Sequence, residues 1–173
     1  MARFLKRLVL FLVVAGIMHL CLLVIFEEFM PAYLKPNIRW EPSSRGHLYT
    51  RMNDLDTIKA VDILILGSSH AYRGFDPRIF RASGYNIFVL GSSAQTPIQT
   101  ARLAEEYIPK LRPKLVIYEA YPRVVGYDGV ESTLDFLAND KLDISLAYLA
   151  LSSKNIMVFN TLLYSFFKKK IAF

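Results

Sequence analysis

The amino-acid sequence predicts an α/β domain with a parallel sheet, preceded by one N-terminal transmembrane helix. Residues 8–26 carry no charged side chain, and further along the chain apolar runs of strand length alternate with a helical pattern. At 173 residues the chain has room for one domain and an anchor, and not for two full domains. We therefore divide it into an anchor (1–28), a juxtamembrane linker with a short helix (29–60) and the α/β domain (61–173).

The N-terminal apolar stretch has the length of a membrane span. At about 1.5 Å per residue, Leu8–Phe26 extends about 28 Å, close to the thickness of a bilayer's hydrocarbon core. Basic residues precede it and acidic residues follow it, namely Arg3, Lys6, Arg7, Glu27 and Glu28. Because basic residues favour the cytoplasmic side, we expect a single-pass protein of a bacterial cytoplasmic (inner) membrane, with its N-terminus inside and its domain extracytoplasmic. A cleavable signal peptide is the alternative, but no small-x-small cleavage site follows Phe26.

Composition narrows the range of partners. The net charge is +6, and much of the excess lies in clusters near the two ends, the second at residues 168–170. Such clusters beside apolar segments fit a lipid bilayer, whereas nucleic acid would need a basic stripe along one face. The single cysteine, Cys21, lies in the apolar stretch, so no disulfide can form within the chain. Nothing in the sequence indicates a metal or an organic cofactor.

Three apolar runs predict strands that are buried on both faces. Residues 61–67 and 85–91 end in glycine, and residues 115–120 end just before a Tyr-Pro pair. Residues 97–110, which lie between the second and third runs, repeat apolar side chains at helical spacing. Alternation of strand, helix and strand means parallel pairing, with crossovers that cover the sheet.

The other segments are expected to be a linker and helices. Proline, serine and glycine make residues 31–46 a linker, and a short helix is expected at 47–59. Helices are also expected at 132–137, 144–151 and 156–167. The last of these is too short to span a bilayer, so we interpret it as a core or interfacial helix.

Serine and glycine residues follow the first two predicted strands. Ser68, Ser69 and His70 come after the first, and Gly91 and Ser92 end the second. Ligands of parallel sheets bind at the carboxyl ends of the strands. A turn there would lift Ser69 to the rim, where N–H groups of the next helical turn can face an oxyanion. The alternative is that these residues only form turns and cap the helices that follow.

Taken together, these blocks resemble the SGNH/GDSL hydrolase superfamily. The closest likeness is to its membrane-anchored branch, the acyltransferase-like proteins that modify cell-wall polymers and exopolysaccharides. The resemblance covers residues 61–123 and includes Gly67-Ser68-Ser69-His70 and Tyr121-Pro122-Arg123. It implies a three-layer α/β/α fold of the flavodoxin-like type, with Ser69 as the nucleophile. The N–H groups of Ser69 and Gly91 would be oxyanion donors, and an ester would react through an acyl-serine intermediate.

The sequence also departs from the family pattern. Ser68 replaces the usual aspartate, and no asparagine ends the third block, where Glu119 stands instead. No histidine follows His70, so the Asp-x-x-His block that supplies the base is absent, and His47 could reach the site only if the linker folds back. We therefore expect an incomplete SGNH-type domain, the N-terminal portion of a longer protein. Its thin sheet would leave an unpaired edge.

Two functions follow as expectations. The first is ester hydrolysis or O-acyl transfer on a cell-envelope polymer, catalytically incomplete in this chain, with Ser69 and Gly91 in catalytic positions. Substrate-binding residues would then be Ser68, His70, Ser92 and Glu119. The second is a non-catalytic envelope binding or assembly protein with a degenerate pocket. The candidate partners, besides the bilayer, are a cell-envelope polysaccharide and an acyl donor protein. The absence of phosphate-loop motifs opposes a third reading, a nucleotide-binding domain.

Overall fold

The sheet has three parallel strands in the order β2–β1–β3. The strands are β1 (Ile63–Gly67), β2 (Ile87–Gly91) and β3 (Leu115–Tyr118), and each lies inside one of the three apolar runs. In this computed structural model, residues 1–44 and 47–171 are described, without the side chains of residues 170 and 171. The α/β class, the parallel sheet and the N-terminal apolar helix are therefore confirmed.

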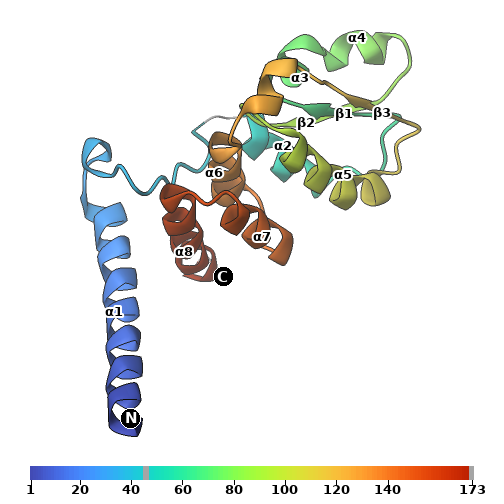
Figure 1. The fold of residues 1–173 in the computed structure, drawn as a ribbon. Helices are drawn as coiled ribbons and strands as arrows, with labels where there is room; N and C mark the ends of the chain where they lie inside the picture. Colours follow the sequence, from blue (N-terminus) through green and yellow to red (C-terminus); the bar gives the residue numbers. More distant parts are fainter. Residues whose placement is uncertain (45–46, 172–173) are drawn as a thin grey trace.

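Helices lie on both faces of the sheet (Figure 1). On one face are α3 (Ser69–Gly74) and α4 (Pro77–Ala82), neither of which we predicted as a separate helix. On the other are α2 (His47–Leu55) and α5 (Pro97–Leu111), with α6 (Val130–Asn139) beyond them. Alternate side chains of β1 point to opposite faces of the sheet. Ile63 and Ile65 pack in a small core with α3, while Leu64 and Leu66 belong to a larger core on the other face.

The larger core extends into the C-terminal helices. It includes residues of α7 (Ile144–Ser152) and of α8 (Ile156–Ile171), among them Leu146 and Val158. Arg102 of α5 ties these parts together, because its guanidinium lies 2.7 Å from Asp140 and 3.3 Å from Asp143. Arg102 is almost completely buried, so these two carboxylates are what makes its burial tolerable.

Strand β3 forms one edge of the sheet and is the least covered of the strands. Leu115, Val116 and Tyr118 are exposed, whereas every residue of β1 and β2 is buried. The outer side of β3 has no neighbouring strand among the described residues. The unpaired edge expected from three strands is therefore present at β3.

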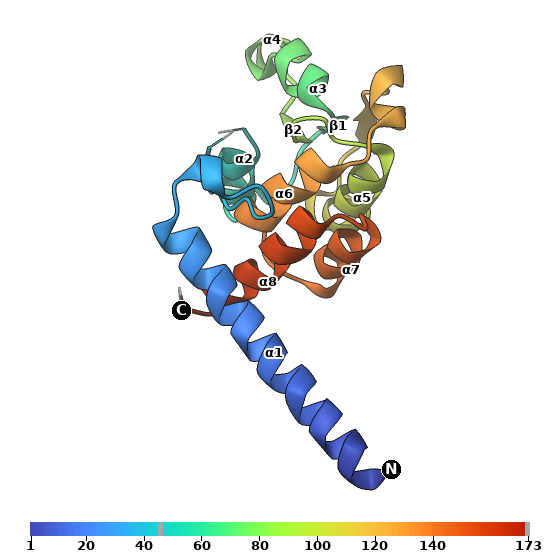
Figure 2. The same cartoon turned by 60° about the vertical axis from the view of Figure 1, so that its left-hand side comes forward.

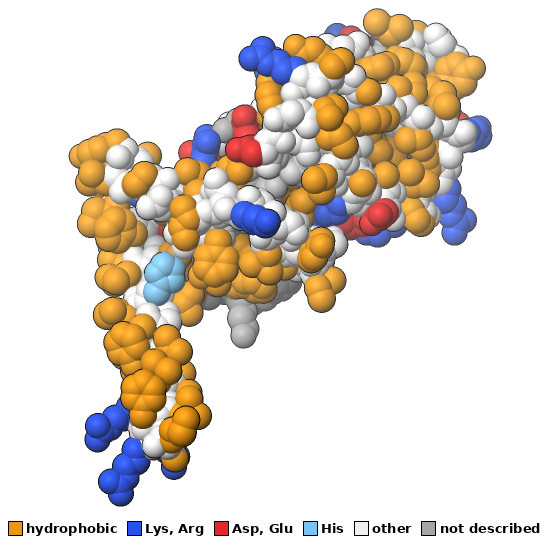
Figure 3. Space-filling model, in the orientation of Figure 1, with side chains coloured by type: hydrophobic (Ala, Val, Ile, Leu, Met, Phe, Trp, Pro, Cys, Tyr) orange, Lys and Arg blue, Asp and Glu red, His pale blue; other side chains and the backbone are white. Residues whose placement is uncertain are grey.

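The N-terminal helix α1 (Ala2–Phe29) projects away from the domain (Figures 1 and 2). It is long and apolar enough to cross a membrane, and within α1, all of which is described, only Leu23 is buried. Figure 3 shows it covered with hydrophobic side chains, with lysine and arginine at its N-terminal end. The core helix of a soluble protein would instead be mostly buried.

The predicted linker folds back onto the C-terminal helix. It contains the short 3-10 helix η1 (Ala32–Leu34), and its Ile38 and Trp40 pack with Tyr164 of α8. The indole of Trp40 meets the ring of Tyr164 edge to face, with 5.6 Å between centroids. The last two linker positions, residues 45–46, lie outside the described part of the chain.

Candidate functional site

The carboxyl ends of the three strands approach each other closely because two of them end in glycine. Gly67 and Gly91 are register partners across β1 and β2. A Cβ atom on Gly91 would lie 2.2 Å from the carbonyl oxygen of Gly67, and one on Gly67 would lie 2.7 Å from Cβ of Glu119. Glycine is therefore required at both positions, and Glu119 is held directly beside the end of β1.

Ser68 is the centre of the hydrogen bonds at this edge. Its backbone N–H and its hydroxyl both donate to Oε2 of Glu119, at 2.9 and 2.7 Å. Its Oγ also lies 3.3 Å from Nδ1 of His70 and accepts from the His70 backbone N–H, which makes Ser68 the N-cap of α3. Ser68 is 1% exposed, so in this arrangement its hydroxyl serves the fold and is closed to a substrate.

Ser69 lies one residue further on, at the first position of α3. It is half-buried, and no described side chain donates to or accepts from its hydroxyl. The adjacent His70 is exposed, and its ring lies 4.2 Å from that of Tyr121. Ser69 is thus the serine that a substrate could reach, but it has no base in contact with it among the described residues.

The loop that follows β2 connects the sheet to α6 through side-chain hydrogen bonds. Ser92 is buried, and its Oγ lies 2.5 Å from Oγ of Ser132 and donates to Gln95 at 3.2 Å. Ser93 donates to Glu131 at 2.8 Å. Beside this loop is a hollow of about 480 Å³, which is lined by Ala94, residues 126–129 and Glu131. Like Ser68, Ser92 has a hydroxyl committed to internal bonds.

A contact that the sequence did not reveal brings His47 to helix α3. The imidazole of His47 stacks on the ring of Tyr72, with 4.1 Å between centroids. Its Nε2 is shielded from solvent and has no hydrogen-bond partner in the described part of the chain. Burial lowers the pKa of His47 from 6.5 to about 4, so the ring is neutral at pH 7. The chain after the linker therefore returns to the sheet, and it places His47 against α3, the helix that begins with Ser69.

Most of the predicted site residues lie at the carboxyl ends of the strands, while the catalytic and binding roles assigned to them stay predictions. Ser68 contacts both His70 and Glu119, and Gly91 lies across from Gly67. Tyr72, which lies within α3, and Tyr121, which follows β3, were not predicted as site residues. Only their aromatic character close to the ends of β1 and β3 could have indicated them. Among the described residues no group of three or more histidine, cysteine or acidic side chains could hold a metal ion.

The comparisons with known proteins return no relative. No family model matches the chain, and neither a curated protein nor a solved structure matches it. The site is therefore interpreted from its own residues.

Proposed function

We propose that this chain is a membrane-anchored SGNH-like protein, and that the site at the carboxyl ends of its strands handles an acyl ester of a cell-envelope polymer. The family chemistry would be ester hydrolysis or O-acyl transfer, with Ser69 in the nucleophile position. The observation that carries the proposal is the convergence of Ser68, His70 and Glu119 at this edge, with Ser68 and Glu119 51 residues apart in the chain. That convergence leaves Ser69 open at the first turn of α3.

The arrangement of the backbone supports the same proposal. A parallel sheet in the order β2–β1–β3 with helices on both faces agrees with the three-layer α/β/α architecture of the family. The N–H groups at the start of α3 and at Gly91 would stabilise the oxyanion of an acyl-transfer intermediate. The hollow beside Ala94 offers room for a polymer at the same edge. The helix α1 would hold the domain at the outer surface of a bacterial inner membrane.

A second candidate function is non-catalytic binding of the polymer or of an acyl donor protein. The observation that favours it is the absence of a base in contact with Ser69 among the described residues. A serine hydroxyl without a base is a weak nucleophile at neutral pH, so the chain would hold its ligand without turning it over.

An active-serine probe separates the two candidates. The full chain, purified in detergent, is treated with a fluorescent fluorophosphonate, alongside Ser69→Ala and Ser83→Ala, the latter changing an exposed serine at the end of α4, outside the site. The enzymatic proposal expects labelling of the wild-type chain, retention of labelling in Ser83→Ala, and its loss in Ser69→Ala. If the folded wild-type chain stays unlabelled while a related active hydrolase reacts, the binding function replaces the enzymatic one. Circular dichroism spectra verify that each sample is folded.

A further inference from the structure

Helices α7 and α8 carry a set of exposed apolar side chains, which we call the α7–α8 surface. On α7 the spacing of four and three residues places Ile144, Tyr148 and Leu151 on one side of the helix, with 89%, 74% and 56% of their surface exposed. On α8 the exposed members are Ile156, Phe159, Phe166 and Phe167. In Figure 3 hydrophobic side chains line the edge of the domain on the side towards which α1 extends.

This end of the domain is fastened to α1. The hydroxyl of Tyr164 in α8 donates to the Glu28 carboxylate at 2.6 Å, and Lys168 forms an ion pair with the same carboxylate. Lower on α1, Leu23 packs with Tyr164 and Ile38. Figures 1 and 2 show α8 beside the upper part of α1, on the same side of the sheet as α7.

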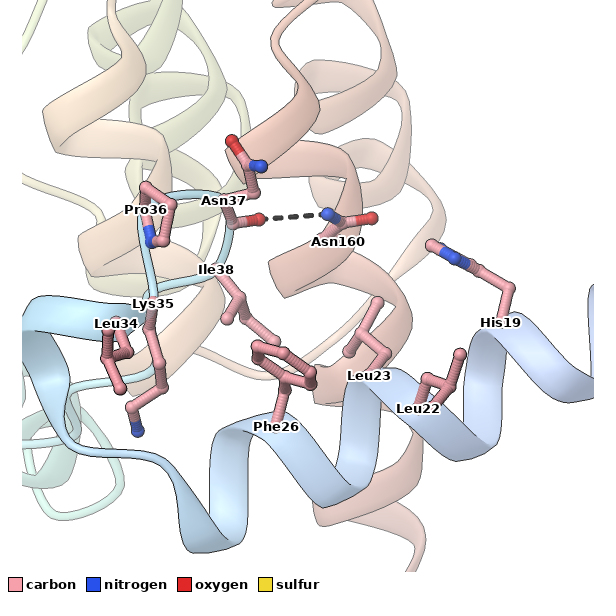
Figure 4. A pocket seen from close by; sticks show the side chains of 10 residues that line it. All are labelled: His19, Leu22, Leu23, Phe26, Leu34, Lys35, Pro36, Asn37, Ile38 and Asn160. Atoms are coloured by element: carbon pink, nitrogen blue, oxygen red, sulfur yellow. Dashed lines mark hydrogen bonds between the residues drawn. The ribbon is translucent and has the colours of Figure 1, made fainter.

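A pocket lies between α1, the linker and α8, beside the contact at Leu23. Its volume is about 290 Å³, and its lining includes His19, Phe26, Ile38 and Asn160 (Figure 4). In Figure 4 the side chains of His19 and Asn160 face each other across this pocket. Asn160 donates to the carbonyl oxygen of Asn37 at 2.9 Å, while its own Oδ1 is buried and has no hydrogen-bond partner among the described residues.

The positions of these contacts along α1 set the depth of α8. The charge-free part of α1 ends at Phe26, so the hydrocarbon boundary of a spanned bilayer falls near Glu27. At about 1.5 Å per residue, Leu23 lies about 6 Å below that boundary and His19 about 12 Å below it. Because α8 packs against α1 at the level of Leu23, that part of α8 lies at the depth of interfacial amphipathic helices, about 5–10 Å into the boundary between headgroups and acyl chains.

We propose that the α7–α8 surface is embedded in the lipid interface of the bilayer that α1 crosses. The inference rests on the membrane anchoring in the proposed function and goes beyond it, because it gives the domain a second membrane contact and a defined orientation. The lipid acyl chains remove the apolar side chains of the surface from water. Trp40 and Tyr164, which pack on one another beside this surface, are residue types that favour the headgroup level.

Depth measurements on single-cysteine variants test the proposal. In a Cys21→Ala background of the full chain, we place one cysteine at Tyr148 (Y148C) and attach a fluorophore that either aqueous iodide or a lipid-borne nitroxide can quench. The matched control is Ile79→Cys on α4, across the sheet, where 67% of the side chain is exposed. A second control, Val13→Cys, lies in the middle of α1. The chains are reconstituted in vesicles of phosphatidylcholine and phosphatidylglycerol, with iodide on both sides.

The proposal expects the label at position 148 to be quenched by the lipid nitroxide, as at position 13, and about five-fold less by iodide than at position 79. If position 148 behaves like position 79 while position 13 is lipid-exposed, the anchor stands and the second contact is refuted. Shielding of position 148 from both quenchers means that protein covers the surface, which also overturns the proposal. If position 13 itself is open to iodide, α1 does not span and the anchoring fails with it.

Discussion

The residues at the end of β1 are determined by how closely three strand ends approach. Gly67 leaves space for the Glu119 side chain, and Gly91 leaves space for the carbonyl oxygen of Gly67. Glu119 then accepts two hydrogen bonds from Ser68, and bonds to a charged acceptor are worth about 1.5–3 kcal/mol each. The role of Ser68 is thus to fix the turn, which in turn sets the position of Ser69.

A methyl group at Gly91 should disrupt this edge. We expect Gly91→Ala to lower the free energy of unfolding by about 2–3 kcal/mol, because backbone must move to accommodate the new atom. The matched control is Gly74→Ala in α3, where nothing lies within 4 Å of the added Cβ, and it should be neutral or stabilise by up to about 1 kcal/mol. Urea unfolding of the full chain in detergent, followed by near-ultraviolet circular dichroism, measures both. Equal effects of the two substitutions would contradict the close approach.

At the scale of elements, the helices are joined by contacts between residues far apart in the chain. Arg102 joins α5 to the segment between α6 and α7, and Ser92 joins the end of β2 to Ser132 of α6. The stacking of His47 on Tyr72 joins the start of α2 to α3. The contacts of Arg102 and Ser92 give hydrogen-bond partners to polar groups that would otherwise be costly to bury.

The docking of α2 on α3 should depend on pH. Folding lowers the pKa of His47 from 6.5 to about 4, so between these values the folded chain binds fewer protons than the unfolded chain. The contribution of His47 is therefore complete above about pH 6.5 and is lost as the pH falls towards 4. Because the ring is partly exposed, we expect a loss of about 1–2 kcal/mol over this range.

The substitution His47→Gln isolates that contribution. Its unfolding free energy, measured from pH 7 down to pH 4 in the same detergent, should fall less steeply than that of the wild-type chain. Carboxylates titrate in both proteins, so the difference between the two curves belongs to His47. Curves that run parallel would show that folding does not depress the pKa of His47.

The whole molecule is an α/β domain attached to a long apolar helix, and its charges predict its orientation. Arg3, Lys6 and Arg7 stand at one end of α1, and Glu27 and Glu28 stand at the other. From the positive-inside rule we predict that the first group lies in the cytoplasm and the domain on the opposite side. The proposed site, with an envelope polymer as its substrate, needs the same orientation.

Cysteine labelling in intact spheroplasts tests the orientation. In the Cys21→Ala background, a membrane-impermeant maleimide should modify Ile79→Cys in intact cells. It should modify Arg3→Cys only after the membrane is permeabilised. The reverse pattern would place the domain in the cytoplasm and would rule out an envelope polymer as the substrate, whatever the chemistry of Ser69.

The sequence was enough to locate much of the site, but it did not predict which of its residues form hydrogen bonds with one another. The run Gly67-Ser68-Ser69-His70 was placed at a strand end because a glycine directly follows an apolar run. That Ser68, and not Ser69, would contact Glu119 depends on which strand lies next to β1. Whether Ser69 is a nucleophile stays a prediction.

The sequence alone determined the features that consecutive residues encode. The long apolar helix follows from an uninterrupted apolar length, the strands from short branched runs, and parallel pairing from their alternation with helices. The tertiary structure alone decided which distant residues meet: Tyr164 with Glu28, 136 residues apart, His47 with Tyr72, and Glu119 with Ser68. The physical reason is that periodicity and length are properties of a local segment, whereas such contacts arise only when elements far apart in the chain pack together.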